Sequence, residues 1–304
     1  MKYIFSTILA GILWGAISIF LKPLVASGLT SVQVMFFRGA LSALVLLVFL
    51  LIKDRALLKV APRDLWTFLG TGVLSLTFFS LCYFTTIIEV GTSVAVILLY
   101  TSPIFILIFS RFLFKEKITL LKVAALVMTF AGCILVSGIA GGGSMTARGF
   151  IIGLGAGFGY ALYSIFSRYA LAKYNFFTVI FYTFVFSAVS ILPFCGLIGA
   201  GEASGLSQAF TPRAGLLLTG ISILCTVLPY FFYTYGLSGL ETGKAAILVT
   251  VEPLVGTLVG FLLWKEEVSF AKVAGIVLIL VAVILLGLPR PSTPSTSSGT
   301  PEDT

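Results

Sequence analysis

Two charged residues lie inside long apolar stretches, where their chemistry needs an explanation. Glu252 falls within 243–264, and at about 1.5 Å per residue it lies roughly 12 Å along the helix that this stretch predicts. A carboxylate inside a bilayer costs at least ~2.5 kcal/mol unless it faces a wet cavity or a partner. The sequence therefore predicts one of two roles. Glu252 either binds a substrate amine or a proton, or acts in gating, or it is a structural carboxylate bonded to freed backbone groups and hydroxyls.

Arg38 is the second such residue, about two turns into the apolar stretch 32–52. Three roles are open: it snorkels to the outer interface, holds neighbouring helix ends, or contacts an anionic group of a substrate. Whether it pairs with Glu252 is also left open. Lys22 and Arg168 stand at matching ends of their stretches, which favours interface anchors.

The remaining composition argues against enzymatic, metal and cofactor chemistry. Histidine is absent, which removes the usual general base and the commonest metal ligand. The four cysteines stand singly inside apolar runs, and no metal or cofactor is predicted. An intramembrane enzyme would need a nucleophile–base or metal set, and the dispersed acids supply none. No ATPase motif is present, so uphill transport would use an ion gradient.

The elements that must position these residues are ten apolar stretches. Of the 304 residues, 59% are hydrophobic and 10% charged, against about 25% charged in an ordinary soluble domain. Each stretch is about as long as a membrane-spanning helix, and alternating strands are missing, so an all-α membrane protein is predicted. The predicted spans are 3–21, 32–52, 65–88, 90–110, 119–139, 149–167, 176–200, 214–236, 243–264 and 269–288.

The basic residues predict orientation. Most of the nineteen Lys and Arg fall in segments on the side of the N-terminus, which by the positive-inside rule puts both termini in the cytoplasm of a multi-pass protein of the cell (inner or plasma) membrane. The net charge of +8 thus reflects contact with the lipid bilayer, and no nucleic-acid partner is predicted. The Ser/Thr/Pro-rich segment 289–304 is predicted to be a disordered cytoplasmic tail.

The two halves of the chain resemble each other when shifted by about 150 positions. Tyr83, Thr92, Pro103 and Lys115-Glu116 then fall on Tyr233, Thr242, Pro253 and Lys265-Glu266. Each half holds an odd number of spans, so the repeats 1–145 and 146–288 must cross the membrane in opposite senses. Two inverted five-helix repeats around a central cavity are typical of secondary transporters, with the substrate site near the midplane.

The repeat also selects candidate site residues. Ser102 is the counterpart of Glu252, and Pro103 and Pro253 should loosen both helices where they face the cavity, as helix-breaking or gating positions. Aromatic residues near the middle of the predicted cavity helices should form an apolar wall with hydroxyl tips, suited to an organic solute: Trp14, Tyr83, Tyr100, Tyr163 and Tyr233.

These motifs resemble a known family. Residues 3–288 are similar to the ten-helix EamA-type members of the drug/metabolite transporter superfamily. The likeness is carried by Leu13-Trp14-Gly15 with Lys22, Arg38-Gly39-Ala40-Leu41, Pro103 with Lys115-Glu116, and Glu252-Pro253 with Lys265-Glu266.

The resemblance implies a central cavity surrounded by spans 1–4 and 6–9, with spans 5 and 10 at the periphery. It also implies a secondary-active transporter that moves a small organic metabolite, an amino acid or related compound, by alternating access, with export expected. The alternative within the superfamily is a flippase for lipid-linked sugars. Substrate identity, coupling ion and the choice between monomer and homodimer stay open.

Overall fold

The computed structural model describes residues 1–137, 146–198, 205–265, 267 and 269–287, and these are helical with no β-strand. Ten of the helices are long and apolar enough to cross a membrane, which confirms the predicted number of spans. They are Lys2–Ala26, Ser31–Lys53, Pro62–Val90, Val94–Leu113, Leu120–Ser137, Ala147–Leu171, Phe176–Phe194, Pro212–Leu237, Thr242–Trp264 and Phe270–Gly287. Glu266 and the predicted tail 289–304 lie outside the described residues, as does the predicted repeat boundary at 145.

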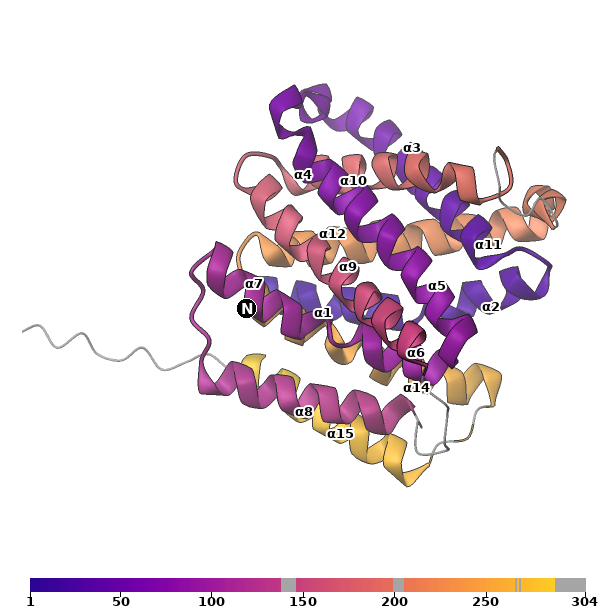
Figure 1. Ribbon diagram of the computed structural model, residues 1–304. Helices are drawn as coiled ribbons and strands as arrows, with labels where there is room; N and C mark the ends of the chain where they lie inside the picture. Colours follow the sequence, from indigo (N-terminus) through magenta and orange to yellow (C-terminus); the bar gives the residue numbers. More distant parts are fainter. Residues whose placement is uncertain (138–145, 199–204, 266, 268, 288–304) are drawn as a thin grey trace, which may run out of the picture.

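The spans are built from the following helices, labelled as in Figure 1. The N-terminal half contains α1 (Lys2–Gly15), α2 (Ser18–Ala26), α3 (Ser31–Lys53), α4 (Leu65–Leu69), α5 (Phe78–Val90), α6 (Thr92–Leu99), α7 (Ser102–Leu113) and α8 (Leu120–Ser137). The C-terminal half contains α9 (Ala147–Leu171), α10 (Phe176–Ile191), α11 (Pro212–Ser222), α12 (Leu228–Leu237), α13 (Thr242–Leu248), α14 (Glu252–Trp264) and α15 (Phe270–Gly287).

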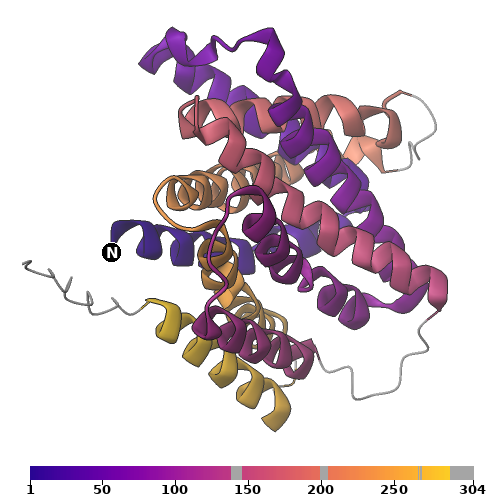
Figure 2. The same cartoon turned by 60° about the vertical axis from the view of Figure 1, so that its left-hand side comes forward.

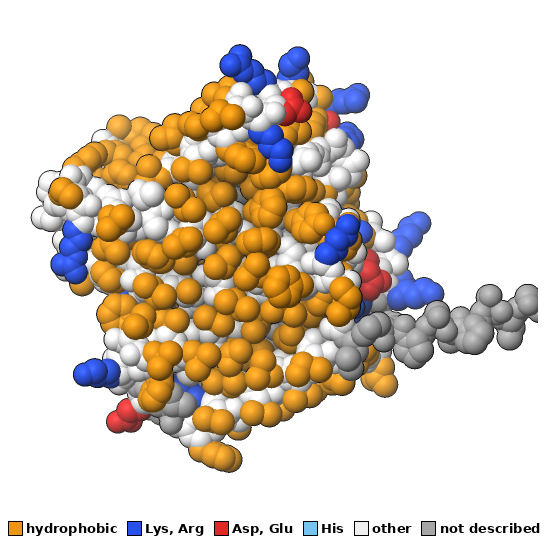
Figure 3. Space-filling view, turned by 180° about the vertical axis from the view of Figure 1, so that it is seen from behind, with side chains coloured by type: hydrophobic (Ala, Val, Ile, Leu, Met, Phe, Trp, Pro, Cys, Tyr) orange, Lys and Arg blue, Asp and Glu red, His pale blue; other side chains and the backbone are white. Residues whose placement is uncertain are grey.

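The helices run back and forth between two faces of the molecule, at the left and right of Figure 1. We call the left-hand side the N-terminal face: it carries Met1 and the connections 54–61, 114–119, 172–175 and 238–241. The opposite face carries the connection 27–30 and the segment 205–211. Figure 3 shows a broad band of hydrophobic side chains between these faces, with Lys and Arg at its edges. Such a band is what a bilayer-spanning protein presents to lipid.

Several spans are interrupted near mid-membrane depth. A π-helical segment, Gly70–Thr77, joins α4 to α5, and another, Ile223–Val227, joins α11 to α12. A turn at 100–101 separates α6 from α7, and a 3-10 turn, Val249–Val251, separates α13 from α14. Proline has no N–H to continue a helix but fits its first turn. This explains why α7 and α14 each begin one residue before a proline, at Ser102 and Glu252.

Small residues allow helices to approach closely at two places that matter for the architecture. α8 and α15 pack together along one edge of the bundle, visible in Figures 1 and 2. A Cβ added to Gly275 would lie 2.5 Å from the carbonyl oxygen of Gly132 on the other helix. Near the centre, a Cβ added to Gly15 would lie 2.6 Å from the carbonyl oxygen of Glu252. The backbone of α1 therefore rests directly on the start of α14.

The close packing at Gly275 predicts the effect of enlarging it. Gly275→Val should separate α15 from α8 and lower the free energy of unfolding by about 1–3 kcal/mol, the usual cost of overpacking. The measurement is thermal melting of the purified protein in detergent. Gly215→Val is the matched control, because nothing lies within 4 Å of a Cβ at Gly215. Equal melting temperatures for the two variants would contradict the prediction.

Candidate functional site

A cavity of about 220 Å³ lies at the centre of the helix bundle, and both unusual charges line it. Both halves of the chain contribute to its walls, which come from α1, α2, α3, α5, α6, α9, α11, α12 and α14. The lining includes Trp14, Met35, Arg38, Phe79, Ser80, Tyr83, Phe84, Tyr160, Tyr230 and Glu252, with Ser31 and Leu21 toward the opposite face. The cavity is thus offset toward the opposite face.

Glu252 is the first residue of α14 and follows the 3-10 turn of Val249–Val251. The helix break and the packing of Gly15 on the carbonyl of Glu252 fix where this side chain leaves the backbone. Among the described residues no ion pair is made with Glu252, and its side chain is part-exposed to the cavity. A carboxylate in this position is available to a solute.

Arg38 projects from α3 into the same cavity. Its Nη2 donates to the Sδ of Met35, at 3.2 Å, and no ion pair links it to Glu252 within the described part of the chain. A thioether is a weak acceptor and a guanidinium carries five N–H donors, so most of its donor capacity is left for an anionic group. Of the three roles open from the sequence, the geometry is compatible with contact to a substrate.

Aromatic rings make up much of the cavity wall. The rings of Trp14 and Tyr230 meet edge to face with centroids 5.0 Å apart, and those of Phe79 and Tyr160 at 5.4 Å. Tyr83 stacks obliquely on Phe79, with centroids 5.7 Å apart. Such walls bury the apolar part of an organic ligand, while a few polar groups fix its orientation.

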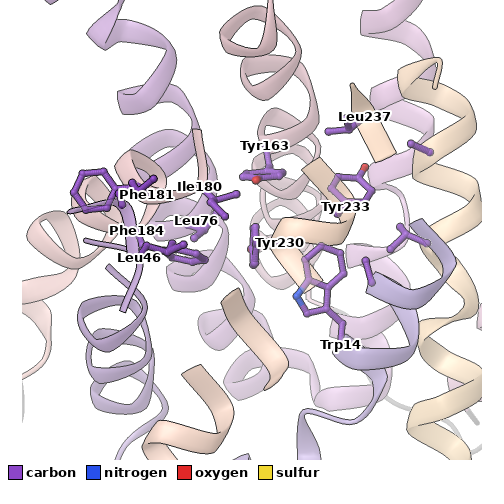
Figure 4. Close-up of a cluster of buried hydrophobic side chains, with 14 residues drawn as sticks. Trp14, Leu46, Leu76, Tyr163, Ile180, Phe181, Phe184, Tyr230, Tyr233 and Leu237 are labelled. Carbon is purple, nitrogen blue, oxygen red and sulfur yellow. The ribbon is translucent and has the colours of Figure 1, made fainter. Parts of the chain in front are cut away.

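Tyr163 and Tyr233, predicted as wall residues, lie nearer the N-terminal face in a buried cluster. Figure 4 shows their rings grouped with Tyr230 and Trp14. The hydroxyl of Tyr163 is 2.7 Å from Oγ1 of Thr234, and that of Tyr233 is 2.8 Å from Oγ of Ser164. Both hydroxyls are therefore engaged in bonds between α9 and α12, and the two rings form a floor beneath the cavity.

Three further predicted residues surround Glu252 from another side. Tyr100, Ser102 and Pro103 border a space of only about 10 Å³ that Glu252 also lines. Tyr100 and Pro253 also line a second, larger space of about 440 Å³. This groove has residues of α6 and α14 in its walls, and Glu252 and Trp14 also line it. Glu252 is thus common to the central cavity and the groove.

Several cavity residues that were not predicted from the sequence share helix faces with predicted ones. Met35 and Ser31 lie three and seven positions before Arg38, and Phe79 lies four before Tyr83. Residues at these spacings share one face of a helix, so extending each face from the selected residue would have found them. Tyr160 and Tyr230 likewise lie three positions before the selected Tyr163 and Tyr233.

Family membership follows from a comparison with known proteins. Residues 1–138 and 147–288 each match the model of the EamA-like transporter family. The chain belongs to this family. Because its EamA-like regions cover nearly all of the described helices, the protein is a multi-pass integral membrane transporter.

Relatives of this EamA-like transporter support the same classification. It is 26% identical to an uncharacterized transporter of Archaeoglobus fulgidus over 281 residues, 91% of this chain and 93% of the relative. It is 25% identical to the uncharacterized transporter YdfC of Bacillus subtilis over 241 residues, 79% of this chain and 76% of the relative. One crystal structure superposes with a TM-score of 0.78 at 17% identity, over 94% of this chain and 96% of that one, which shows a shared fold.

The floor hydrogen bonds predict a measurable coupling. In a double-mutant cycle, Tyr233→Phe and Ser164→Ala should each lower the free energy of unfolding by about 1 kcal/mol, and the double variant by little more than either. The measurement is again thermal melting in detergent. Ser238→Ala removes an exposed hydroxyl and serves as the control. Strictly additive losses would mean that the two hydroxyls do not interact.

Proposed function

We propose that this EamA-like transporter is a secondary-active carrier of a small organic metabolite that bears an anionic and a cationic group, such as an amino acid or related compound. The observation that carries the proposal is the placement of Arg38 and Glu252 in one aromatic-walled cavity without an ion pair between them. A zwitterion with an apolar side chain would place its carboxylate on Arg38, its amine on Glu252 and its apolar part among the rings.

Alternating access by two inverted repeats, 1–145 and 146–288, supplies the mechanism. Two likenesses of local structure support the repeat. Lys115 and Lys265, paired by the sequence alignment, are the non-glycine residues with positive φ among those described, at 56° and 53°. Nζ of Lys122 donates to the carbonyl oxygen of Lys117, and Nζ of Lys272 to that of Glu267, both at 2.9 Å.

The proposal includes the orientation of the protein in the membrane and the direction of transport. The excess of basic residues on the N-terminal face supports a cytoplasmic location for that face, with both termini inside and the protein in the cell membrane. The central cavity is offset toward the opposite face, which is then external. Export would load the solute from the cytoplasm and release it through this external side.

A flippase for lipid-linked sugars is the second candidate, favoured by the groove between α6 and α14. A headgroup moved by a flippase must reach the site from the side of the protein while its lipid tail stays in the membrane. Proteoliposomes offered a water-soluble amino acid or a fluorescent lipid-linked sugar would distinguish the two. Movement of the lipid-linked sugar alone would overturn the main proposal.

Removing the carboxylate of Glu252 should abolish driven transport. Glu252→Gln keeps the size of the side chain but can neither hold a substrate amine by charge nor exchange a proton. We expect gradient-driven uptake of radiolabelled amino acids into proteoliposomes to fall at least about 100-fold, a loss of ~2.7 kcal/mol. Glu89→Gln, which removes a carboxylate paired with Arg148 outside the cavity, is the matched control. Full transport by Glu252→Gln would remove this residue from the mechanism.

Removing the charge of Arg38 should weaken binding of the substrate anion. Loss of a charge-assisted hydrogen bond costs about 1.5–3 kcal/mol, so Arg38→Gln should raise the half-saturating concentration roughly tenfold to a hundredfold. Arg38→Lys should recover part of this loss, because a point charge replaces the planar guanidinium. Concentration dependence of counterflow measures both. An Arg38→Gln variant with unchanged half-saturation would show that Arg38 does not touch the solute.

A further inference from the structure

The N-terminal face is closed by a carboxylate that the transport site does not use. Glu116 lies in the connection between α7 and α8 and is only 8% exposed. Its Oε1 accepts from the N–H of Thr242 at 2.7 Å, and its Oε2 from the N–H of Gly243 at 3.2 Å. One side chain of the N-terminal half thus binds two consecutive backbone groups of the C-terminal half.

A buried lysine completes this arrangement. Lys122 is 3% exposed, and its Nζ lies 2.9 Å from Oε2 of Glu241 and 3.9 Å from Oε2 of Glu116. Its third neighbour is the carbonyl oxygen of Lys117, at 2.9 Å. We call Glu116, Lys122, Glu241 and the N–H groups of Thr242 and Gly243 the Glu116 cluster. Burial makes such an arrangement costly to disrupt by removing one partner.

The Glu116 cluster acts on the same span that carries Glu252. Thr242 begins α13, which leads through Val249–Val251 directly to Glu252. α13 packs against α7, and Gly243 lies against Leu107 and Ser110 of that helix. The Glu116 cluster therefore fixes the end of the span on the side where the cavity is sealed.

The equivalent place on the opposite face is open. The sequence alignment pairs α7 with α14 and α13 with α6, so contact between α6 and α14 would mirror that between α7 and α13. Instead, the groove of about 440 Å³ lies between them, with Thr92, Val96 and Tyr100 on one side and Gly256, Thr257 and Gly260 on the other. Lys272, the counterpart of the buried Lys122, lines this groove. Matching sequence elements thus occupy a closed environment on one face and an open one on the other.

From this asymmetry we propose that the Glu116 cluster holds the N-terminal face closed, and that Glu116 must release Thr242 and Gly243 before that face opens. Glu116 is a positioning residue: it touches no solute and acts by holding α13 against α7. In the opposite state Lys122 becomes exposed and the groove around Lys272 closes. The inference rests on alternating access as proposed above, but it concerns the equilibrium between two conformations and needs no knowledge of the substrate.

The test measures accessibility on both faces at once. Ser110→Cys places a thiol in the closed α7–α13 contact, where Ser110 is 1% exposed, and Ser31→Cys places one in the cavity lining toward the opposite face. Each is made separately in full-length protein whose four native cysteines are replaced by alanine. Both are reacted in proteoliposomes with a membrane-impermeant maleimide applied to one face or the other, with and without Glu116→Gln.

We expect Glu116→Gln to change labelling in opposite directions on the two faces. The amide oxygen of a glutamine can accept a hydrogen bond from one of the two N–H groups. Its NH2 group is a donor and cannot accept from the other N–H, so Glu116→Gln weakens the closed state. Labelling of Ser110→Cys should rise about tenfold while labelling of Ser31→Cys falls. Glu116→Asp keeps the charge on a shorter side chain and should give an intermediate increase. Glu89→Gln, on the opposite face, should leave Ser110→Cys protected.

Two results would overturn the proposal. Unchanged labelling at both positions would mean that Glu116 does not hold this face closed. A rise at both positions, together with a lower melting temperature in Glu116→Gln and in Glu116→Asp, would mean that Glu116 only stabilises the fold. Neither result depends on transport, so failure of the proposed substrate class would be recognised separately, by transport assays on protein that labels as expected.

Discussion

The structure depends on one constraint: within a bilayer, a charge or an unpaired backbone group is tolerated only where it faces water or a protein partner. In the described residues the ten spans are built almost entirely of helix, in which backbone groups bond within the same segment. The two central breaks, at 100–101 and Val249–Val251, come just before Pro103 and Pro253, and a proline has no N–H to give to a carbonyl of the preceding turn. They occur beside the cavity and the groove, where Glu252 also lies. Helix breaks and the intramembrane carboxylate therefore share a location because they share a requirement.

Close packing of α1 against α14 fixes the position of Glu252. Gly15 lets the backbone of α1 rest on the carbonyl of Glu252, so α1 forms the partition between the central cavity and the groove. Trp14, the residue before Gly15, lines both spaces. A larger side chain at Gly15 would move the partition and the carboxylate together. The position of the site is thus set by backbone contact, which is less adaptable than contact between side chains.

The tyrosines have two roles: some bond neighbouring helices together through their hydroxyl groups, and others line the cavity. Tyr163 and Tyr233 bond to Thr234 and Ser164, tie α9 to α12 and form the floor. Tyr83, nearer the opposite face, lines the cavity. Together with Arg38 and Glu252, the rings give the cavity two charges set in an apolar surround. This combination is the basis of the proposal that the solute is apolar in part and charged in part.

The sequence by itself determined the ten spans, the helical class and the two intramembrane charges, because lipid imposes the same length and polarity on every span. It also predicted that the two helices loosen around Pro103 and Pro253, because a proline limits its own backbone wherever it occurs, and the breaks lie just before these prolines. Only the tertiary structure decided that Arg38 and Glu252 share a cavity, that Tyr163 and Tyr233 lie in the floor, and that Glu116 binds α13. These relations join residues far apart in the chain, and the repeat that predicts Lys122 and Lys272 to be equivalent cannot say which of them is buried. In the alternating-access mechanism proposed above, that difference belongs to the conformation, since one sequence would support both states.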